Sequence, residues 1–345
     1  MKFMNSRAAL LKYPGNPLQL GEIQLREPRG PEVLLRVKGA GVCRTDLRIV
    51  KGEEARPNIK LPMALGHENA GIIEAVGENV VGLNVGDAVA VYATWGCMRC
   101  RYCREGKYSL CKEQEIPGQT THGGYSQFML VPSFTWLVKL GGLDPVSAAP
   151  LADAGTTSMG AVRKVSNRLG PNSTVVVYGA GGVALYLIQV IKALHSNVKV
   201  IAVSRSEERR MAASRRGADL AIHPKDLVES VRALSSEDAQ VAFDVVGDEK
   251  STALLSQVLS SDGEIVLVGL EGKSLSLPTF ETVVWEHKVL GSNYGTLNDL
   301  EDVITLAREG KVSLNVRTYP LEEVNEALSA LDRGEVVDTR LVVVP

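Results

Sequence analysis

The sequence between residues 174 and 184 constrains the fold more than any other part of the chain. An apolar run at 174–178 leads directly into the loop GAGGVA at 179–184, and an amphipathic helical pattern follows. A Gly-x-Gly-x-x-Ala loop between a strand and a helix is typical of dinucleotide binding, because its glycines let the backbone approach a pyrophosphate at the helix N-terminus. The alternative is a tight turn in an α/β fold that binds no nucleotide.

The segments after this loop repeat the same theme. Further buried strands are predicted at 199–203, 241–246 and 264–268, with helices between them at 207–217 and 251–259. Apolar strands that alternate with helices indicate right-handed βαβ units and a parallel sheet covered on both faces. The sequence therefore predicts an α/β domain with a doubly wound sheet.

The first part of the chain has a different texture. Short strands are predicted at 33–37, 70–76 and 88–91, with turns between them and almost no helical periodicity up to about residue 139. This pattern favours a β-rich domain that is a barrel or sandwich-like. A chain of 345 residues exceeds the usual size of a single core, so two domains are expected.

The pattern changes again at about residue 145. A helix is predicted over 145–161, and this segment contains Asp153. Helices at 297–309 and 321–332 and a strand at 341–344 could belong to either domain.

The overall charge argues against two classes of partner. The net charge is −2, which gives no electrostatic reason to expect nucleic acid or an anionic membrane. No apolar stretch is long enough to span a bilayer, and the N-terminus lacks the features of a signal peptide. We therefore expect a cytoplasmic protein.

Four of the five cysteines, Cys97, Cys100, Cys103 and Cys111, lie close together in the sequence. Four thiolates at this spacing can close a tetrahedron around zinc, which would leave no open position and make the zinc structural. An iron–sulfur cluster is the alternative, although the proline that follows the last cysteine in bacterial ferredoxins is missing here.

The fifth cysteine lies in a polar segment, Cys43-Arg44-Thr45-Asp46, just after the strand predicted at 33–37. Its thiolate can bind a metal, and Thr45 can transfer a proton. Together with His67 and a third ligand, Cys43 would form a three-ligand zinc site with an open fourth position, which is the catalytic arrangement.

The end of the second strand of the α/β domain bears on which dinucleotide would bind. An NAD site usually carries a carboxylate there, but this chain has Ser204-Arg205-Ser206. Hydroxyls and a guanidinium suit the 2′-phosphate of NADP. The simpler interpretation is a solvated helix start that Ser206 caps. We expect NADP, with NAD as the alternative.

Taken together, these motifs resemble the zinc-dependent medium-chain alcohol dehydrogenases, and the resemblance runs nearly the length of the chain. It rests on the segments around Cys43 and His67, the turn at 85–89, the four-cysteine lobe, the segment 149–157 and the glycine loop. It implies a GroES-like β-rich catalytic domain, formed by 1–150 and 290–345, and a Rossmann dinucleotide-binding domain at 151–289. It also implies a homotetramer or a homodimer.

The resemblance implies a role for each matching residue. Cys43, His67 and Asp153 look like ligands of a catalytic zinc, with Glu68 close to the metal and Asp46 orienting His67. Asp153 stands where many members carry a second cysteine. With the four-cysteine zinc this makes two zinc ions per chain. The cofactor contacts would be Arg44, Thr157, Gly179, Gly181, Gly182, Val183, Ser204, Arg205, Val246, Val268, Gly269 and Arg340.

The implied reaction is hydride transfer between an alcohol and NAD(P), with Thr45 as the first proton acceptor. Family members often continue this relay to a histidine three positions further, where this chain has Arg48. A sugar or polyol is the alternative substrate, because the family includes such dehydrogenases. A sensor that binds zinc and nucleotide without catalysis is the alternative from another class.

Overall fold

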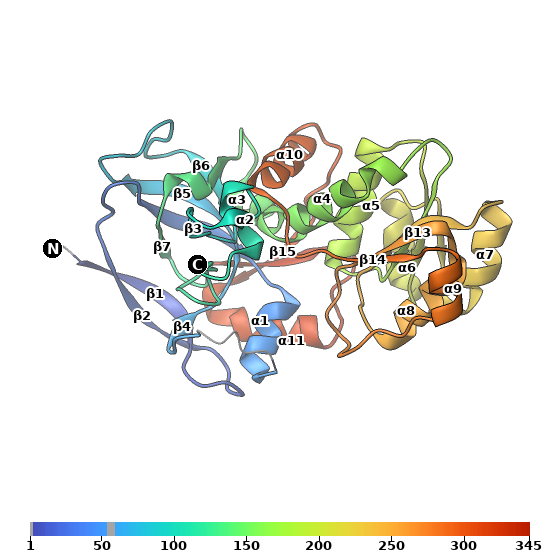
Figure 1. Cartoon of the computed structure of the whole chain (residues 1–345). Helices are drawn as coiled ribbons and strands as arrows, with labels where there is room; N and C mark the ends of the chain where they lie inside the picture. The colour runs from blue at the N-terminus through green and yellow to red at the C-terminus, as the bar shows by residue number, and fades with distance from the viewer. Residues whose placement is uncertain (1–2, 54–58) are drawn as a thin grey trace. The chain divides into compact units, whose positions relative to one another are not determined.

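The computed structural model describes residues 3–53 and 59–345. The chain forms two compact units: unit 1 comprises Met1–Thr156, Thr296–Arg308 and Ser313–Pro345, and unit 2 comprises Thr157–Gly295 and Glu309–Val312. The first unit therefore includes the C-terminal segment of the chain as well as the N-terminal half (Figure 1).

Unit 1 is built mainly from β-strands, as the sequence predicts. Its larger sheet has the order β15-β16-β3-β5-β6-β8, with β7 paired to β3, and a smaller sheet has the order β2-β1-β4. The strands are β1 (Phe3–Leu11), β2 (Gln19–Arg26), β3 (Val33–Gly41), β4 (Met63–Ala64), β5 (Glu68–Val76), β6 (Ala88–Val91), β7 (Phe128–Val131), β8 (Leu137–Lys139), β15 (Val316–Pro320) and β16 (Arg340–Val344).

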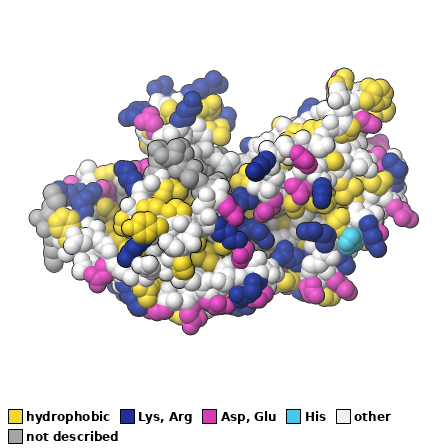
Figure 2. Space-filling view, turned by 90° about the horizontal axis from the view of Figure 1, so that it is seen from below, with side chains coloured by type: hydrophobic (Ala, Val, Ile, Leu, Met, Phe, Trp, Pro, Cys, Tyr) yellow, Lys and Arg dark blue, Asp and Glu magenta, His cyan; other side chains and the backbone are white. Residues whose placement is uncertain are grey.

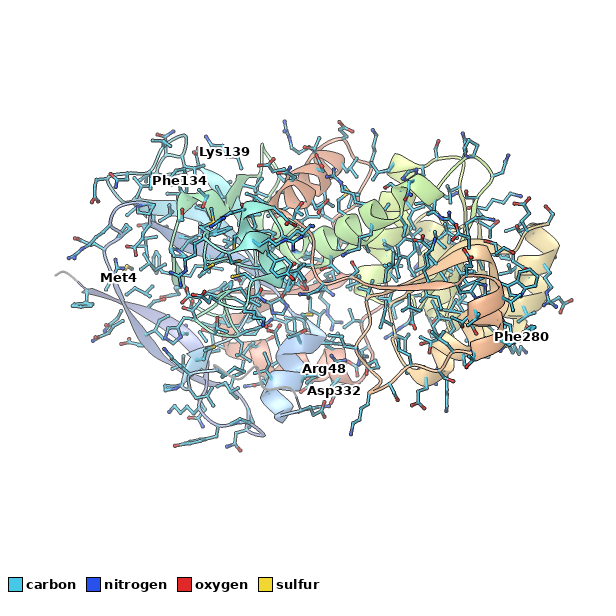
Figure 3. All side chains as sticks on the ribbon, viewed as in Figure 1. Met4, Arg48, Phe134, Lys139, Phe280 and Asp332 are labelled. Atoms are coloured by element: carbon cyan, nitrogen blue, oxygen red, sulfur yellow. The ribbon has the colours of Figure 1, made fainter. Side chains whose placement is uncertain are left out.

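Short helices connect these strands. The two helices α1 and α11 are joined by an ion pair of 2.8 Å between Lys51 and Asp332, and Figure 3 labels Arg48 and Asp332 on them. The helices of this unit are α1 (Arg44–Lys51), α2 (Arg101–Arg104), α3 (Pro145–Ala148), α10 (Leu297–Arg308) and α11 (Val324–Asp332), with 3-10 turns η1 (Tyr108–Leu110), η2 (Phe134–Trp136), η3 (Ala149–Ala152) and η7 (Leu321–Glu323).

Unit 2 contains the predicted doubly wound sheet. All its strand pairs are parallel, in the order β11-β10-β9-β12-β13-β14. Residues along β9 and β10 are buried almost without interruption, because helices cover both faces, with α5 and α8 on opposite sides (Figure 1). The strands are β9 (Thr174–Tyr178), β10 (Lys199–Val203), β11 (Leu220–Ile222), β12 (Ala239–Asp244), β13 (Leu259–Leu267) and β14 (Lys288–Gly291).

The helices of unit 2 connect consecutive parallel strands, as in βαβ units. Apolar side chains from strands and helices meet in one core cluster, which includes Val176, Ile201, Ala242, Leu255 and Ile265. The helix α4 (Ala154–Lys164) starts in the last residues of unit 1 and continues into unit 2. The other helices are α5 (Gly182–Leu194), α6 (Glu207–Arg215), α7 (Leu227–Leu234), α8 (Glu249–Leu255) and α9 (Thr279–Val284), with 3-10 turns η4 (Ser166–Arg168), η5 (Pro224–Asp226) and η6 (Ser256–Val258).

Three local predictions were wrong. The single helix expected over 145–161 is three elements, because Asp153 leaves helical geometry with φ −127° and ψ −68° between η3 and α4. The helix expected over 251–259 ends earlier, and Leu259 begins β13. The helix α1, in a region expected to be almost free of helices, begins directly after Cys43.

The surface shows no single dominant charge. Figure 2 shows basic and acidic side chains intermingled on the face that it presents, in keeping with the net charge of −2. Among the described residues, every helix is too short or too polar to cross a membrane.

Candidate functional site

The pairing of two strands brings Cys43 and His67 together. In the antiparallel pair β3 and β5, Gly41 lies opposite Glu68, so the residue two positions after β3 and the residue just before β5 meet at the same end of the sheet. Gly41 allows this close approach, because a β-carbon there would overlap the carboxylate of Glu68. The third residue, Asp153, comes from the break between η3 and α4.

These side chains converge on one point. One possible ligand atom each from Cys43, His67, Glu68 and Asp153 lies within 4.8 Å of all the others. The distance from Nε2 of His67 to Oδ2 of Asp153 is 3.5 Å. Ligand atoms about 2.0–2.3 Å from a tetrahedral zinc lie about 3.3–3.8 Å from one another. The donor set of thiol, imidazole and carboxylate therefore fits a zinc ion.

Asp46 contacts the other ring nitrogen of His67. The distance from Nδ1 of His67 to Oδ1 of Asp46 is 3.1 Å, and both side chains are buried. The backbone N–H of Cys43 donates to Oδ2 of Asp46 at 3.0 Å, which also fixes the start of α1. Since Nδ1–H donates to the carboxylate, Nε2 keeps its lone pair for a metal.

Glu68 lies in the same cluster and is fully buried. Its Oε1 accepts a hydrogen bond from Arg340, whereas its Oε2 has no hydrogen-bond partner among the described residues. Burial raises the pKa of Glu68, and the charge of Arg340 opposes this rise. Burial also acts to raise the pKa of Asp153, but His67 and Arg340 lower it further than burial raises it. A buried carboxylate oxygen that lacks a hydrogen-bond partner and lies beside other possible metal ligands is a further feature that suits a bound cation.

The predicted contacts of unit 1 occupy different positions relative to this cluster. Thr45 and Arg44 lie in the first turn of α1, with Thr45 partly buried and Arg44 exposed. Arg340, at the start of β16, is buried and pairs with Glu68. The sequence does not reveal this pair, and the role of Arg340 as a cofactor contact stays a prediction.

The four-cysteine lobe also brings its sulfurs together. The ligand atoms of Cys97, Cys100, Cys103 and Cys111 all lie within 4.8 Å of one another, around the short helix α2. Backbone N–H groups lower the pKa of Cys97 to about 7, while burial raises the pKa of Cys103 to about 12. Four thiols this close would normally repel as thiolates, so the arrangement fits a metal that neutralises them.

In unit 2 the glycine loop lies between β9 and α5, as the sequence predicts. Gly179 has φ +102°, which favours glycine, and its N–H donates to the carbonyl of Val203 at 2.9 Å. The helix α5 follows with Gly181 as N-cap and without a side-chain cap, so no capping side chain competes with an anion for its first N–H groups. The next predicted contact, Val183, lies in this first turn.

The loop after β10 carries the residues expected to select the dinucleotide. Ser204 and Arg205 follow the strand, and Ser206 caps α6 by accepting from the N–H of Arg209 at 3.3 Å. The helix-cap interpretation of Ser206 is therefore confirmed. The guanidinium of Arg210 donates to the carbonyls of both Ser204 and Arg205 at 2.9 Å, which holds the loop in shape.

The remaining predicted contacts lie at strand ends or in a helix of the same unit. A β-carbon on Gly179 would lie 3.3 Å from Val246, so the loop after β12 packs against the glycine loop. The N–H groups of Val268 and Gly269 both donate to the carbonyl of Asp244 at 2.9 Å. Thr157 lies in α4 and is buried.

Comparison with known families gives two matches. The alcohol dehydrogenase GroES-like domain matches residues 29–142, and the zinc-binding dehydrogenase domain matches residues 182–309. These segments lie in unit 1 and mainly in unit 2, respectively.

Comparison with individual proteins extends the likeness to the whole chain. The D-arabinose 1-dehydrogenase (NADP(+)) of Saccharolobus solfataricus is 50% identical over 100% of this chain and 99% of its own. The NAD-dependent alcohol dehydrogenase of Sulfurisphaera tokodaii is 39% identical over 98% and 99%.

Solved structures agree with these sequence comparisons. The crystal structure of the D-arabinose dehydrogenase from Sulfolobus solfataricus matches with a TM-score of 0.90 and 48% identity, over 99% of this chain and 100% of that one. The alcohol dehydrogenase of Aeropyrum pernix matches with a TM-score of 0.91 and 35% identity, over 98% and 100%. The chain therefore belongs to the zinc-dependent medium-chain alcohol dehydrogenase family and is an oxidoreductase with a GroES-like domain and a Rossmann-type domain.

Proposed function

We propose that this enzyme oxidises the hydroxyl group of an aldose, with NADP as hydride acceptor. The observation that carries the proposal is the full-length identity of 50% with an NADP-dependent D-arabinose 1-dehydrogenase. The loop Ser204-Arg205, which lacks the carboxylate of NAD sites, supports the same cofactor. D-arabinose is the first substrate to test, and simple alcohols are the second, because the family relatives include NAD-dependent alcohol dehydrogenases.

Cys43, His67 and Asp153 would hold the catalytic zinc, and the four cysteines of the lobe would hold a second, structural zinc. When bound, the catalytic zinc supplies a Lewis acid that favours loss of the proton from the substrate hydroxyl. Asp46 keeps His67 in the tautomer that leaves Nε2 free as a ligand.

Thr45 would accept the proton of the substrate hydroxyl at its own hydroxyl oxygen. It lies two residues after Cys43, at the start of α1, so the same helix positions the ligand and the proton acceptor. Arg48, three residues further, is a permanent cation and cannot accept a proton, so we infer that the proton leaves Thr45 by a route other than that side chain.

The glycine loop and the start of α5 would bind the pyrophosphate of the dinucleotide, and Ser204 and Arg205 its 2′-phosphate. In this arrangement Arg210 acts through the loop backbone, because its guanidinium bridges the two carbonyls of these residues. The cofactor would also contact residues that follow the ends of β12 and β13 in the same unit, namely Val246, Val268 and Gly269.

A comparison of cofactors and substrates tests this proposal. We expect D-arabinose with NADP to give the highest kcat/KM in a panel that pairs aldoses, primary alcohols and aromatic alcohols with NADP and NAD. Arg205→Leu should lower kcat/KM for NADP roughly 10- to 150-fold, since a hydrogen bond to a charged group contributes about 1.5–3 kcal/mol, and should leave NAD nearly unchanged. Arg215→Leu, at the far end of α6, is the matched control. A strong preference of the wild type for NAD would refute the cofactor assignment, and a preference for alcohols would refute the substrate.

We also propose that the chain forms at least a homodimer through the β14 edge of the unit 2 sheet. Among the described residues β14 pairs only with β13, and the other edge of such a strand can pair with a second copy. Just before this strand in the sequence, α9 and the residue after it expose Phe280, Val283 and Trp285 by 71%, 68% and 49%, and Figure 3 shows Phe280 at the periphery of this unit. Large exposed apolar side chains in the segment that leads into an edge strand favour an interface there.

The mass in solution tests this assembly. Light scattering coupled to gel filtration should give a dimer or a tetramer for the wild type and a smaller species for Val283→Glu. Leu194→Glu, at an exposed apolar position at the end of α5, should change nothing. A wild type that is monomeric at micromolar concentration would contradict the proposal.

A further inference from the structure

Asp46 is the centre of a buried hydrogen-bond network that extends beyond the metal ligands. Its Oδ1 lies 3.1 Å from Nδ1 of His67, and its Oδ2 accepts from the backbone N–H of Cys43 at 3.0 Å. The same Oδ2 also accepts from the hydroxyl of Tyr125 at 3.0 Å. The side chains of Asp46 and Tyr125 are 0% exposed and that of His67 is 1% exposed, so water does not compete for these bonds.

Tyr125 is fixed in place independently of its hydroxyl. Its N–H donates to the carbonyl of Leu65 at 2.9 Å, and the N–H of Gly124 donates to the carbonyl of Gly66 at 2.9 Å. Its ring packs so closely on Gly66 that a β-carbon there would collide with it, and Gly66 has φ +91°. The residue before His67 and the ring of Tyr125 therefore form one rigid contact.

We propose that Tyr125 is a positioning residue for the metal-binding histidine. Its hydroxyl holds the carboxylate of Asp46 in the one orientation that accepts from His67 through Oδ1 and from Cys43 through Oδ2. Both metal-binding residues are thereby oriented through a single buried carboxylate. The inference rests on the proposed catalytic zinc site, because the role that we give to this network is to retain that zinc.

The chemistry of Asp46 explains why a third donor matters. A buried carboxylate is stabilised by the hydrogen bonds that it accepts, and outer partners of metal-binding histidines typically affect metal affinity 10- to 100-fold. Without the tyrosine hydroxyl, Oδ2 would keep only the N–H of Cys43 within this network. The carboxylate could then rotate and release Nδ1 of His67.

The test is the rate at which each zinc leaves the enzyme. Purified Tyr125→Phe and wild-type enzyme, each loaded with zinc, are mixed with an excess of a chromogenic chelator, and release is followed over time. We expect the zinc of the Cys43 site to leave roughly 5- to 10-fold faster in Tyr125→Phe. The zinc of the four-cysteine lobe should leave at an unchanged rate and serves as an internal reference. Tyr186→Phe, a buried tyrosine in α5, is the matched control for loss of a hydroxyl.

A second measurement separates positioning from general loosening. Cobalt substituted at the catalytic site has an absorption spectrum that reports ligand geometry, and we expect a shifted spectrum in Tyr125→Phe with a thermal midpoint close to that of the control variant. Release within twofold of wild type with an unchanged cobalt spectrum would overturn the role of Tyr125. A wild-type enzyme that holds no metal at the Cys43 site would instead refute the proposed function, so the two failures are distinguishable.

Discussion

Replacing Arg340 by leucine tests the buried ion pair beside the candidate metal site. Glu68 is 0% exposed and Arg340 is 9% exposed, so removal of the guanidinium leaves a carboxylate without its cation in a site that excludes water. Breaking a buried pair in this way costs about 3–5 kcal/mol. For a folded unit of this size each kcal/mol lowers the unfolding midpoint by about 2–4 °C, so we expect a fall of roughly 6–20 °C.

The assay is thermal unfolding, followed by circular dichroism, of enzyme without nucleotide and with the Cys43 site depleted of zinc, so that no metal ion replaces the charge of Arg340 beside Glu68. The double variant Glu68→Gln/Arg340→Leu should recover much of the loss, because no buried charge is left unpaired. Burial raises the pKa of Glu68, so the folded state disfavours its ionised form. The deficit of Arg340→Leu should therefore grow as the pH rises from about 5.5 to about 8, where the unfolded chain carries an ionised Glu68. A midpoint unchanged in the single variant, or a deficit that does not vary with pH, would refute this reasoning.

Three further predictions concern other parts of the chain. Cys103→Ser should lower the free energy of unfolding by roughly 2–5 kcal/mol and remove one zinc while the Cys43 site keeps its own, as metal analysis and denaturant titration would show. Burial lowers the pKa of His122, whose Nδ1 accepts a hydrogen bond from the backbone N–H of Ala64. The neutral histidine therefore contributes stability at a pH above its pKa in the unfolded chain, and this stability is lost as the pH falls through its pKa in the folded protein. His122→Gln should flatten the acid side of a plot of urea midpoint against pH. Asp262→Asn, which removes an acceptor for Arg168, should cost less than about 1 kcal/mol, and the difference should disappear in about 1 M salt.

Features that repeat at short range could be predicted from the sequence. The apolar runs of the Rossmann-type domain appear as β9, β10, β12 and β13, because fully buried parallel strands leave a continuous apolar signal. The cysteine lobe was also predictable, since its four ligands lie within a single loop region.

Contacts between distant segments could not be predicted in this way. Tyr125 and Asp46 are 79 residues apart, and Arg340 and Glu68 are 272 residues apart, so no spacing in the sequence relates them. The helix α1 was missed because it is short and begins at a cysteine, which is not a usual N-cap residue. The position of Asp153 beside His67 followed only from the family resemblance, since the helix expected around it is interrupted at that residue.

The most direct test of the account is anomalous diffraction at the zinc absorption edge from crystals of the wild-type enzyme. We predict one peak within bonding distance of Sγ of Cys43, Nε2 of His67 and a carboxylate oxygen of Asp153, in addition to a peak among the four cysteines of the lobe. A zinc-replete, active enzyme with a peak only at the four-cysteine lobe would contradict the central claim.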